Sequence, residues 1–426
     1  MTRTPWLTSL GVALAVLAAT TTGCSAGGRA GAERVEVSMW SHSAGNPAEI
    51  EVINRIIADF NASQDRYTVK PEFFPQAAYN DAIVAAATAG DLPCLLDMDG
   101  PVMPNWAWAR VIAPLDLPES LTDQFLPSTV GRWNGRIYSI GYWDAALAMF
   151  ARRSVLESNG VRVPTMDRPW TKDEFDAALV TLKNAGFEHA IDLGNYDTGE
   201  WWPYAYSPML QSFGGDLIDR GTYRTAQGAL NGPRAVAFAQ WFQSLFTRGL
   251  ASKSPTPDRQ DFLLGNVAIA WNGNWSAPDA IEKYGEDLLL LPPPDFGEGP
   301  KIGGASWQWG LSANCPSLDG ARRYIAFSLK PEYVAAFSEE TGLIPATDAA
   351  AALTEEYGPD GRLHELVGFS REYAVIRPPT PAYSVISSVF EKTMQDVMNG
   401  ADVQTSLDSA VDQIDFNLES NDNYGL

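Results

Sequence analysis

The stretch Gly265–Trp275 reads Gly-Asn-Val-Ala-Ile-Ala-Trp-Asn-Gly-Asn-Trp. Its apolar run, residues 267–270, lies between a Gly-Asn and an Asn-Gly pair, a pattern typical of a short buried strand that runs into a turn. The turn carries Trp271, Asn274 and Trp275, whose indoles can stack on a ligand and whose amide can bond its hydroxyls. The alternative is that both indoles cap a core, because tryptophan is highly buried on average.

Strand and helix patterns alternate in the first part of the chain. Alternating apolar residues predict a strand at 35–39, and Asn46 followed by Pro47 opens a helix. A second strand, an alanine-rich helix and a third strand at 94–98 follow. This order predicts an α/β fold with a largely parallel sheet, in which ligands bind beyond the carboxyl ends of the strands. Those ends carry Trp40, His42, Asp97 and Asp99.

Further motifs continue the pattern along the chain. Asn134-Gly135 predicts a hairpin turn that leads into a long extended run. Thr171 and Glu174 form a capping box that opens a helix. A loop is expected to carry Trp201 and Trp202, and a strand near 306–313 places two indoles on one face. The aromatic and acidic side chains in these segments are Tyr142, Trp143, Asp144, Trp201, Trp202, Trp307 and Trp309.

Other tryptophans are expected in packing positions. Trp106 and Trp108 lie two apart on a predicted helix, so they cannot share a face and one of them should be core. We assign Trp133, Trp170 and Trp241 to packing.

Length and charge narrow the class of protein. With 426 residues, 45% of them hydrophobic, the chain is long enough for two domains or two lobes. A formal charge of −22 argues against nucleic acid and against anionic membrane surfaces as partners. The three histidines are too widely spaced for a zinc site, and neither phosphate-loop nor dinucleotide spacing is present, so we expect no metal and no cofactor.

The N-terminus has the features of an export signal. Arg3 precedes an apolar run too short to span a bilayer, and small residues lead to Cys24. This end resembles the lipobox of bacterial lipoproteins, with Thr21 where leucine is usual. We therefore predict a signal peptide at 1–23, lipidation at Cys24 and a flexible tether at 24–33, with a plain cleaved signal peptide as the alternative.

The two remaining cysteines form an even pair. If Cys24 carries lipid, Cys94 and Cys315 are left in an oxidising compartment, where disulfides persist. We predict that they are bonded, and two separately buried thiols are the alternative.

Several motifs in a fixed order resemble a known family. They include Leu92–Asp97, Gly135–Ile140, the opening Gly-Asn-Val-Ala-Ile-Ala-Trp, Trp309–Asn314 and Thr341–Pro345. Together they resemble the extracellular solute-binding proteins of ABC importers, in the carbohydrate-binding, maltose-binding-protein-like class. The resemblance covers nearly the whole mature chain.

The resemblance implies a two-lobed α/β fold of the periplasmic-binding-protein type, with three inter-lobe crossings and a ligand cleft between the lobes. The crossings would fall near 140–146, 307–311 and 341–346. The N-terminal lobe would comprise 34–141 plus 309–342, and the C-terminal lobe 142–308 plus 343–426. The strand of Cys94 would lie antiparallel to the strand that ends at Cys315, which makes the disulfide geometrically reasonable.

The resemblance also implies a ligand site. Carboxylates bond adjacent sugar hydroxyls and indoles cover the C–H face of the ring, so the aromatic and acidic residues fit a neutral mono- or oligosaccharide. Tyr383 and Arg377 are weaker candidates. The predicted ligand set is Trp40, His42, Asp97, Asp99, Tyr142, Trp143, Asp144, Trp201, Trp202, Trp271, Asn274, Trp275, Trp307, Trp309 and Tyr383.

We therefore expect a monomeric, lipid-anchored receptor on the outer face of the cytoplasmic membrane. It would deliver the sugar to an ABC permease, without catalysis and without contacting the membrane except through its anchor. A secreted glycosidase using two of Asp97, Asp99 and Asp144 is the competing class. A sugar sensor or adhesin on the same fold is the third.

Overall fold

The computed structural model describes residues 34–257, 260–304 and 307–426. The predicted signal peptide, tether and lipidation site at Cys24 lie outside the described residues. Among the described helices, none is long and apolar enough to cross a membrane.

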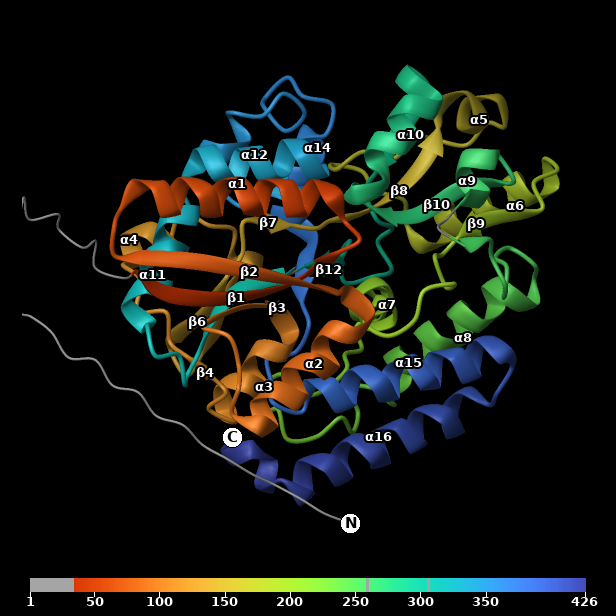
Figure 1. Cartoon of the computed structure of the whole chain (residues 1–426). Helices are drawn as coiled ribbons and strands as arrows, with labels where there is room; N and C mark the ends of the chain where they lie inside the picture. Colours follow the sequence, from red (N-terminus) through yellow and green to blue (C-terminus); the bar gives the residue numbers. More distant parts are fainter. Residues whose placement is uncertain (1–33, 258–259, 305–306) are drawn as a thin grey trace, which may run out of the picture.

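The first sheet has seven strands. The strand pairs at one side of the sheet are parallel, and the remaining pairs are antiparallel (Figure 1). β1 pairs in parallel with β2 and β3, as the alternation predicts. β13 comes from far along the chain and lies antiparallel between β3 and β6. The strands, in spatial order, are β2 (Tyr67–Pro75), β1 (Val35–Ala44), β3 (Leu95–Asp99), β13 (Trp307–Ser312), β6 (Arg136–Ile140) and β5 (Val130–Trp133), with β4 (Ile112–Ala113) on β13.

Helices cover the first sheet, and we call this unit the first lobe. The Asn46 side chain caps the first helix with Pro47 at its first position, as predicted. Trp106 is buried while Trp108 is 43% exposed, so one of the pair is core, also as predicted. The helices of the first lobe are α1 (Pro47–Ser63), α2 (Gln76–Ala89), α3 (Met103–Trp108), α4 (Glu119–Thr122), α11 (Leu318–Ser328) and α12 (Pro331–Thr341), with short turns η1 (Gly100–Val102) and η2 (Pro127–Thr129).

The second sheet is built around the stretch at 265–275. β10 lies between β8 and β9, and all seven of its residues are buried. The strand is longer than the predicted 267–270, because Trp271, Asn272 and Gly273 continue the antiparallel pairing with β8. The order is β11 (Leu288–Leu291), β8 (Leu147–Arg152), β10 (Val267–Gly273) and β9 (His189–Asp192).

The helices around the second sheet complete the second lobe (Figure 1). The capping box of Thr171 and Glu174 is present at the start of its helix. Trp170 and Trp241 are buried, as predicted. The helices are α5 (Arg153–Ser158), α6 (Lys172–Asn184), α7 (Trp201–Ser212), α8 (Pro233–Thr247), α9 (Gln260–Leu264), α10 (Ala277–Tyr284), α15 (Tyr383–Asn399) and α16 (Val403–Ser420), with turns η4 (Asn274–Ser276), η5 (Gly285–Asp287) and η6 (Asp422–Gly425).

The prediction that Trp201 and Trp202 lie on a loop is wrong, because both begin helix α7. Pro203 is tolerated in the first turn, where backbone N–H groups have no partner inside the helix. Pro208 lies inside the helix and cannot bond the carbonyl of Tyr204. Gly303 packs against that carbonyl, and a Cβ at Gly303 would lie 2.3 Å from its oxygen.

Two short strand pairs lie between the large sheets. The chain leaves the first sheet after β6, passes through β7 and enters the second sheet at β8. We call residues 141–146 and 342–347 the linking segments, because their strands β7 (Trp143–Asp144) and β14 (Ile344–Pro345) pair with each other. The other pair is β12 (Ile302–Gly304) with β15 (Ala374–Ile376), which contacts α14 (His364–Tyr373), while α13 (Asp348–Ala351) contacts β14.

The return to the first sheet falls earlier than predicted. Trp307 and Gln308 already pair with Asp99 and Met98 in the first sheet, so the passage precedes 307 rather than occupying 307–311.

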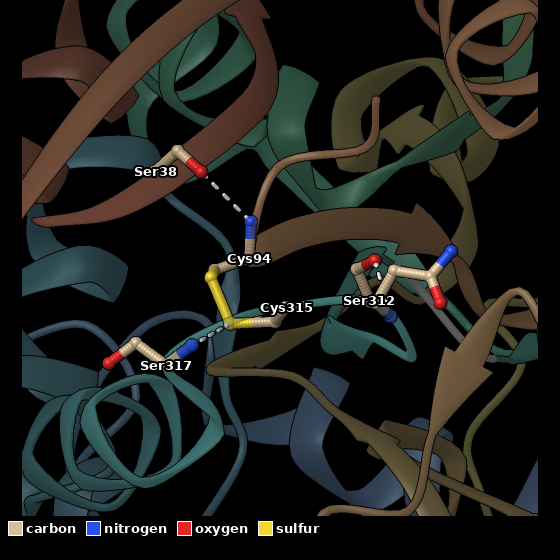
Figure 2. Close-up of a disulfide and its surroundings, with 6 residues drawn as sticks. Ser38, Cys94, Ser312, Cys315 and Ser317 are labelled. Carbon is tan, nitrogen blue, oxygen red and sulfur yellow. Dashed lines mark hydrogen bonds between the residues drawn. A yellow bond between two sulfur atoms is a disulfide. The ribbon is translucent and has the colours of Figure 1, made fainter. Parts of the chain in front are cut away.

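A disulfide joins Cys94 to Cys315, which confirms the predicted bond (Figure 2). The backbone N–H of Cys94 donates to the hydroxyl of Ser38 on β1, and Cys315 follows the end of β13. The bond therefore ties the antiparallel pair β3 and β13 at the end remote from Asp97 and Asp99. It closes a loop of 221 residues that includes the whole second sheet.

Removing this disulfide should destabilise the protein. In Cys94→Ala/Cys315→Ala we expect the free energy of unfolding to fall by about 2–5 kcal/mol, because a long loop is no longer closed in the unfolded chain. Urea unfolding followed by far-UV circular dichroism measures the loss. The wild type treated with reductant should match the variant, and an unchanged midpoint in both would contradict the prediction.

Candidate functional site

The ends of β1 and β3 and the beginning of β13 bring four predicted residues together. They are His42, Asp97, Asp99 and Trp307. In the antiparallel register Trp307 lies opposite Asp99, so both side chains share one face of the sheet. This is the strand edge at which the sequence predicts ligand binding.

His42 is held between carboxylates. Its Nδ1 lies 2.6 Å from Oδ2 of Asp97, and its Nε2 lies 3.7 Å from Oε2 of Glu49. The backbone N–H of His42 and the hydroxyl of Ser41 also donate to Asp97. Burial lowers the pKa of His42, but Asp97, Glu49 and Asp99 together outweigh it, so the pKa is raised above 6.5. The carboxylates therefore favour the imidazolium form.

Aromatic rings enclose this charged group. Trp307 stacks on the His42 ring with centroids 3.7 Å apart and planes 12° from parallel. Tyr79 meets Trp307 edge-on, and its hydroxyl donates to the backbone oxygen of Trp40. Trp40, half-buried, packs on Phe74. The first lobe thus has a stacked imidazole ring bordered by indoles.

Arg377 connects the two lobes. Its guanidinium donates to both oxygens of Asp99, each at 3.1 Å, and to Oε2 of Glu200 at 2.6 Å. Glu200, directly before α7, also accepts from the hydroxyls of Tyr383 and Ser387. Burial and the charge of Glu200 raise the pKa of Asp99, against the lowering effect of Arg377. A buried ion network therefore lies between the end of β3 and the beginning of α7.

The second lobe contributes an aromatic wall, which we define as Trp201, Tyr204 and Trp275. The Trp275 ring lies 6.3 Å from each of the other two rings. Arg377 lies 5.2 Å above the Tyr204 ring, so the wall adjoins the ion network. The Trp275 ring folds back over Gly273, where a Cβ would come within 2.3 Å of three ring carbons. The Asn-Gly-Asn-Trp turn thus needs glycine at 273 to seat this indole.

Several predicted ligand residues are core or structural instead. Trp271 is 1% exposed and donates its indole N–H to the backbone of Ala205. Asn274 is fully buried and bonds the backbone of Ala146 and Gly342 and the hydroxyl of Tyr357. Asp144 is buried and accepts from Ser128 and Ser370. In this structure these three side chains contact the protein's own groups. The other buried members of the predicted set are His42, Asp97, Asp99, Tyr142, Trp143, Trp201, Trp202, Trp309 and Tyr383.

The side chains of the predicted set are buried for different physical reasons. Trp202 packs on Tyr206 and Phe242 because α7 is a helix rather than a loop. Tyr142 and Trp143 belong to the first linking segment, and both contact Phe337 of α12. Trp309 packs on Tyr142, whereas Trp307 stacks on His42, and both indoles line a small cavity beside His42. Tyr383 serves the ion network through Glu200.

Sequence reasoning missed Glu49, Glu200 and Tyr204, and gave Arg377 a minor place. Tyr204 could have been found, because it lies three residues after Trp201 and shares its helix face. Glu49 lies in the first turn of α1, directly after the segment of His42. Nothing in the sequence links Arg377 to Asp99, which lies 278 positions earlier.

The site contains charged, aromatic and hydroxyl groups. In the described part of the chain, no group of three His, Cys, Asp or Glu side chains could hold a metal ion. A cavity of about 640 Å³ adjoins the ion network, and Arg377, Gln308 and Tyr223 are among its lining residues. None of the fifteen predicted ligand residues is among its described lining residues.

This geometry defines a two-lobed α/β binding protein with a charged and aromatic site between its sheets. The chain matches the bacterial extracellular solute-binding protein family over residues 55–362. It belongs to that family.

Solved structures and curated relatives agree with this assignment. The cyclic alpha-maltosyl-1,6-maltose binding protein of Arthrobacter globiformis has a TM-score of 0.77 at 22% identity, covering 91% of this chain and 100% of that one. The GacH receptor of Streptomyces glaucescens has a TM-score of 0.74 at 20% identity, covering 91% and 98%. The sn-glycerol-3-phosphate-binding periplasmic protein UgpB of Yersinia pestis is 21% identical, covering 76% of each chain.

Gly273→Ala should displace the Trp275 ring without disturbing the strand. The backbone φ of Gly273 is −93°, which alanine adopts, so only the ring must move. We expect the indole N–H resonance of Trp275, assigned through Trp275→Phe, to shift in a ¹⁵N spectrum. The resonance of buried Trp170 is the control, and an unmoved Trp275 signal would contradict the seating role of Gly273.

The raised pKa of His42 predicts a pH-dependent contribution to stability. The contribution is complete below the unfolded pKa of about 6.5 and disappears as the pH rises through the higher folded value. Wild type should therefore lose its stability advantage over His42→Gln, measured as the difference in unfolding free energy, as the pH rises from 6 to 9. A difference that grows with pH in urea titrations would refute this sign.

Proposed function

We propose that this protein captures a neutral mono- or oligosaccharide between its lobes and delivers it to the permease of an ABC importer. The proposal rests on the aromatic wall of Trp201, Tyr204 and Trp275. Arg377 connects this wall to Asp99 of the first lobe. Aromatic faces cover the C–H face of a sugar ring, and carboxylates accept bonds from neighbouring hydroxyls. The proposed ligand set is this wall together with Trp40, His42, Asp97, Asp99 and Trp307.

The charged groups of the site favour a neutral sugar over a sugar phosphate. Four carboxylates, those of Glu49, Asp97, Asp99 and Glu200, surround two basic groups, His42 and Arg377. Both basic groups already contact carboxylates, so a phosphate would meet excess negative charge. This favours a neutral ligand over glycerol 3-phosphate, the ligand named for the UgpB relatives.

The names of the structural neighbours support a carbohydrate. The ligands of three of those proteins are a cyclic maltosyl-maltose, acarbose and tagatose. The ligands differ in size, so they support the class of ligand rather than its length.

Capture would follow from a population shift. A ligand that touches both lobes binds the closed arrangement better than the open one, and so stabilises it. No covalent chemistry is required. Each of the three carboxylates that a glycosidase could use already bonds a protein group, Asp97 to His42, Asp99 to Arg377 and Asp144 to Ser128 and Ser370, and this supports binding without catalysis.

The cellular setting is part of the proposal. An extracellular family implies export. We propose that Cys24 is the lipid-modified residue after removal of 1–23, that 24–33 tethers the protein to the outer face of the membrane, and that it acts as a monomer. The N-terminal lobe would comprise 34–141 and a second segment that begins with β13 at 307, rather than at 309, and ends at 342. A non-transport sensor or adhesin on this fold is the second candidate.

A thermal-shift screen tests the ligand class. We expect at least one neutral sugar at millimolar concentration to raise the melting temperature, because ligand binding stabilises the native state by mass action. Glycerol 3-phosphate at the same concentration should not. Trp275→Ala should lower the affinity for the active sugar by at least about tenfold, the loss typical of a well-packed aromatic contact.

Trp108→Ala is the matched control, because Trp108 is an exposed indole on α3 of the other lobe. It should bind sugar as the wild type does. Stabilisation by glycerol 3-phosphate but by no neutral sugar would overturn the proposed ligand class, and release of reducing ends from an oligosaccharide would overturn the receptor function.

A further inference from the structure

Asn274 lies one residue before Trp275 and contacts both linking segments. Its Oδ1 accepts from the backbone N–H of Ala146 at 3.1 Å, and its own N–H donates to the oxygen of Ala146 at 3.0 Å. Its Nδ2 donates to the backbone oxygen of Gly342 at 2.9 Å and to the hydroxyl of Tyr357 at 3.1 Å. The Tyr357 hydroxyl in turn donates to the same oxygen of Gly342.

These bonds specify an amide rather than any polar side chain. One side of the group must accept from Ala146, while the other must donate twice. A carboxylate could make the first bond but would place an acceptor against the carbonyl of Gly342. Because Asn274 is fully buried, no water replaces a lost partner without cost.

The aromatic wall meets the first linking segment at a second point. The hydroxyl of Tyr204 donates to the backbone oxygen of Ala145 at 3.0 Å. Tyr204 of the wall thus bonds Ala145. Asn274, the residue before Trp275 of the wall, bonds the adjacent Ala146. Gly342 lies at the other linking segment, which pairs with the first through β7 and β14.

We infer that Asn274 is a positioning residue that couples the aromatic wall to the two linking segments, so that sugar stacking on Trp275 is transmitted to lobe closure. This inference rests on the proposed function. Ala145, Ala146 and Gly342 lie in the linking segments, so a relative rotation of the lobes would change the backbone there. A wall fastened to both places moves with them as one body, and ligand contact at Trp275 then favours one arrangement of the linking segments.

Asn274→Asp tests the coupling with a nearly isosteric change. We expect sugar affinity to fall by about tenfold, within the usual range of coupling between sites. The sugar-induced decrease in the radius of gyration should be lost, although Trp275 itself is retained. Calorimetry measures the affinity, small-angle X-ray scattering measures closure, and circular dichroism confirms that the variant is folded.

Asn195→Asp is the matched control. Asn195 is a buried asparagine of the same lobe whose amide donates to Ser252 and Met398, away from the linking segments. A merely structural role for Asn274 would lower stability in both variants and leave closure intact in both. The coupling role predicts loss of closure in Asn274→Asp alone.

Tyr357→Phe keeps the test decisive if Asn274→Asp does not fold. It removes only the hydroxyl shared by Asn274 and Gly342, and it should reduce closure in the same direction by a smaller amount. Wild-type closure in a folded Asn274→Asp variant, or in Tyr357→Phe, overturns the inference while leaving the proposed function intact. A wild type that neither binds nor contracts with any sugar overturns the proposed function and this inference with it.

Discussion

The placement of β13 between β3 and β6 is the constraint on which the rest of the structure depends. A strand that returns from the second sheet and lies antiparallel to β3 makes the first lobe discontinuous in sequence. The same register sets Trp307 beside Asp99 at one end of the strand and brings Cys315 to Cys94 at the other. The ligand edge and the disulfide are therefore two consequences of a single strand pairing.

The charged groups at this edge are better explained by specificity than by stability. Taking Asp99 and Arg377 out of water costs several kcal/mol per ion, and such pairs often contribute little net free energy. Their geometry is nevertheless restrictive, because Arg377 holds both oxygens of Asp99 while reaching the second lobe. The network fixes how the lobes face each other and leaves no uncompensated positive charge for an anion.

Local signals predicted most of the elements, since their causes lie within a few residues. The cap at Asn46 and the turn at Asn134-Gly135, where both residues have positive φ, need no tertiary information. Asp144 shows the limit of such signals. It lies beside aromatic residues in an extended run, but its partner Ser370 is 226 positions away and no local pattern reveals the bond. Arg377 and Asp99 were likewise beyond reach, because their pairing depends on how two lobes meet.

The stretch around Trp275 combines both kinds of cause. A short apolar run and its flanking turns predict a buried strand there, but they do not determine whether Trp271 or Trp275 reaches the site. That choice depends on where pairing with β8 ends, and it continues through Gly273. Trp271 is consequently inside the sheet, while Trp275 lies beyond it and folds over the glycine that ends the strand. The wall is thereby held before any ligand arrives, and a surface ordered in advance loses less conformational entropy on binding than one that must be assembled around a sugar.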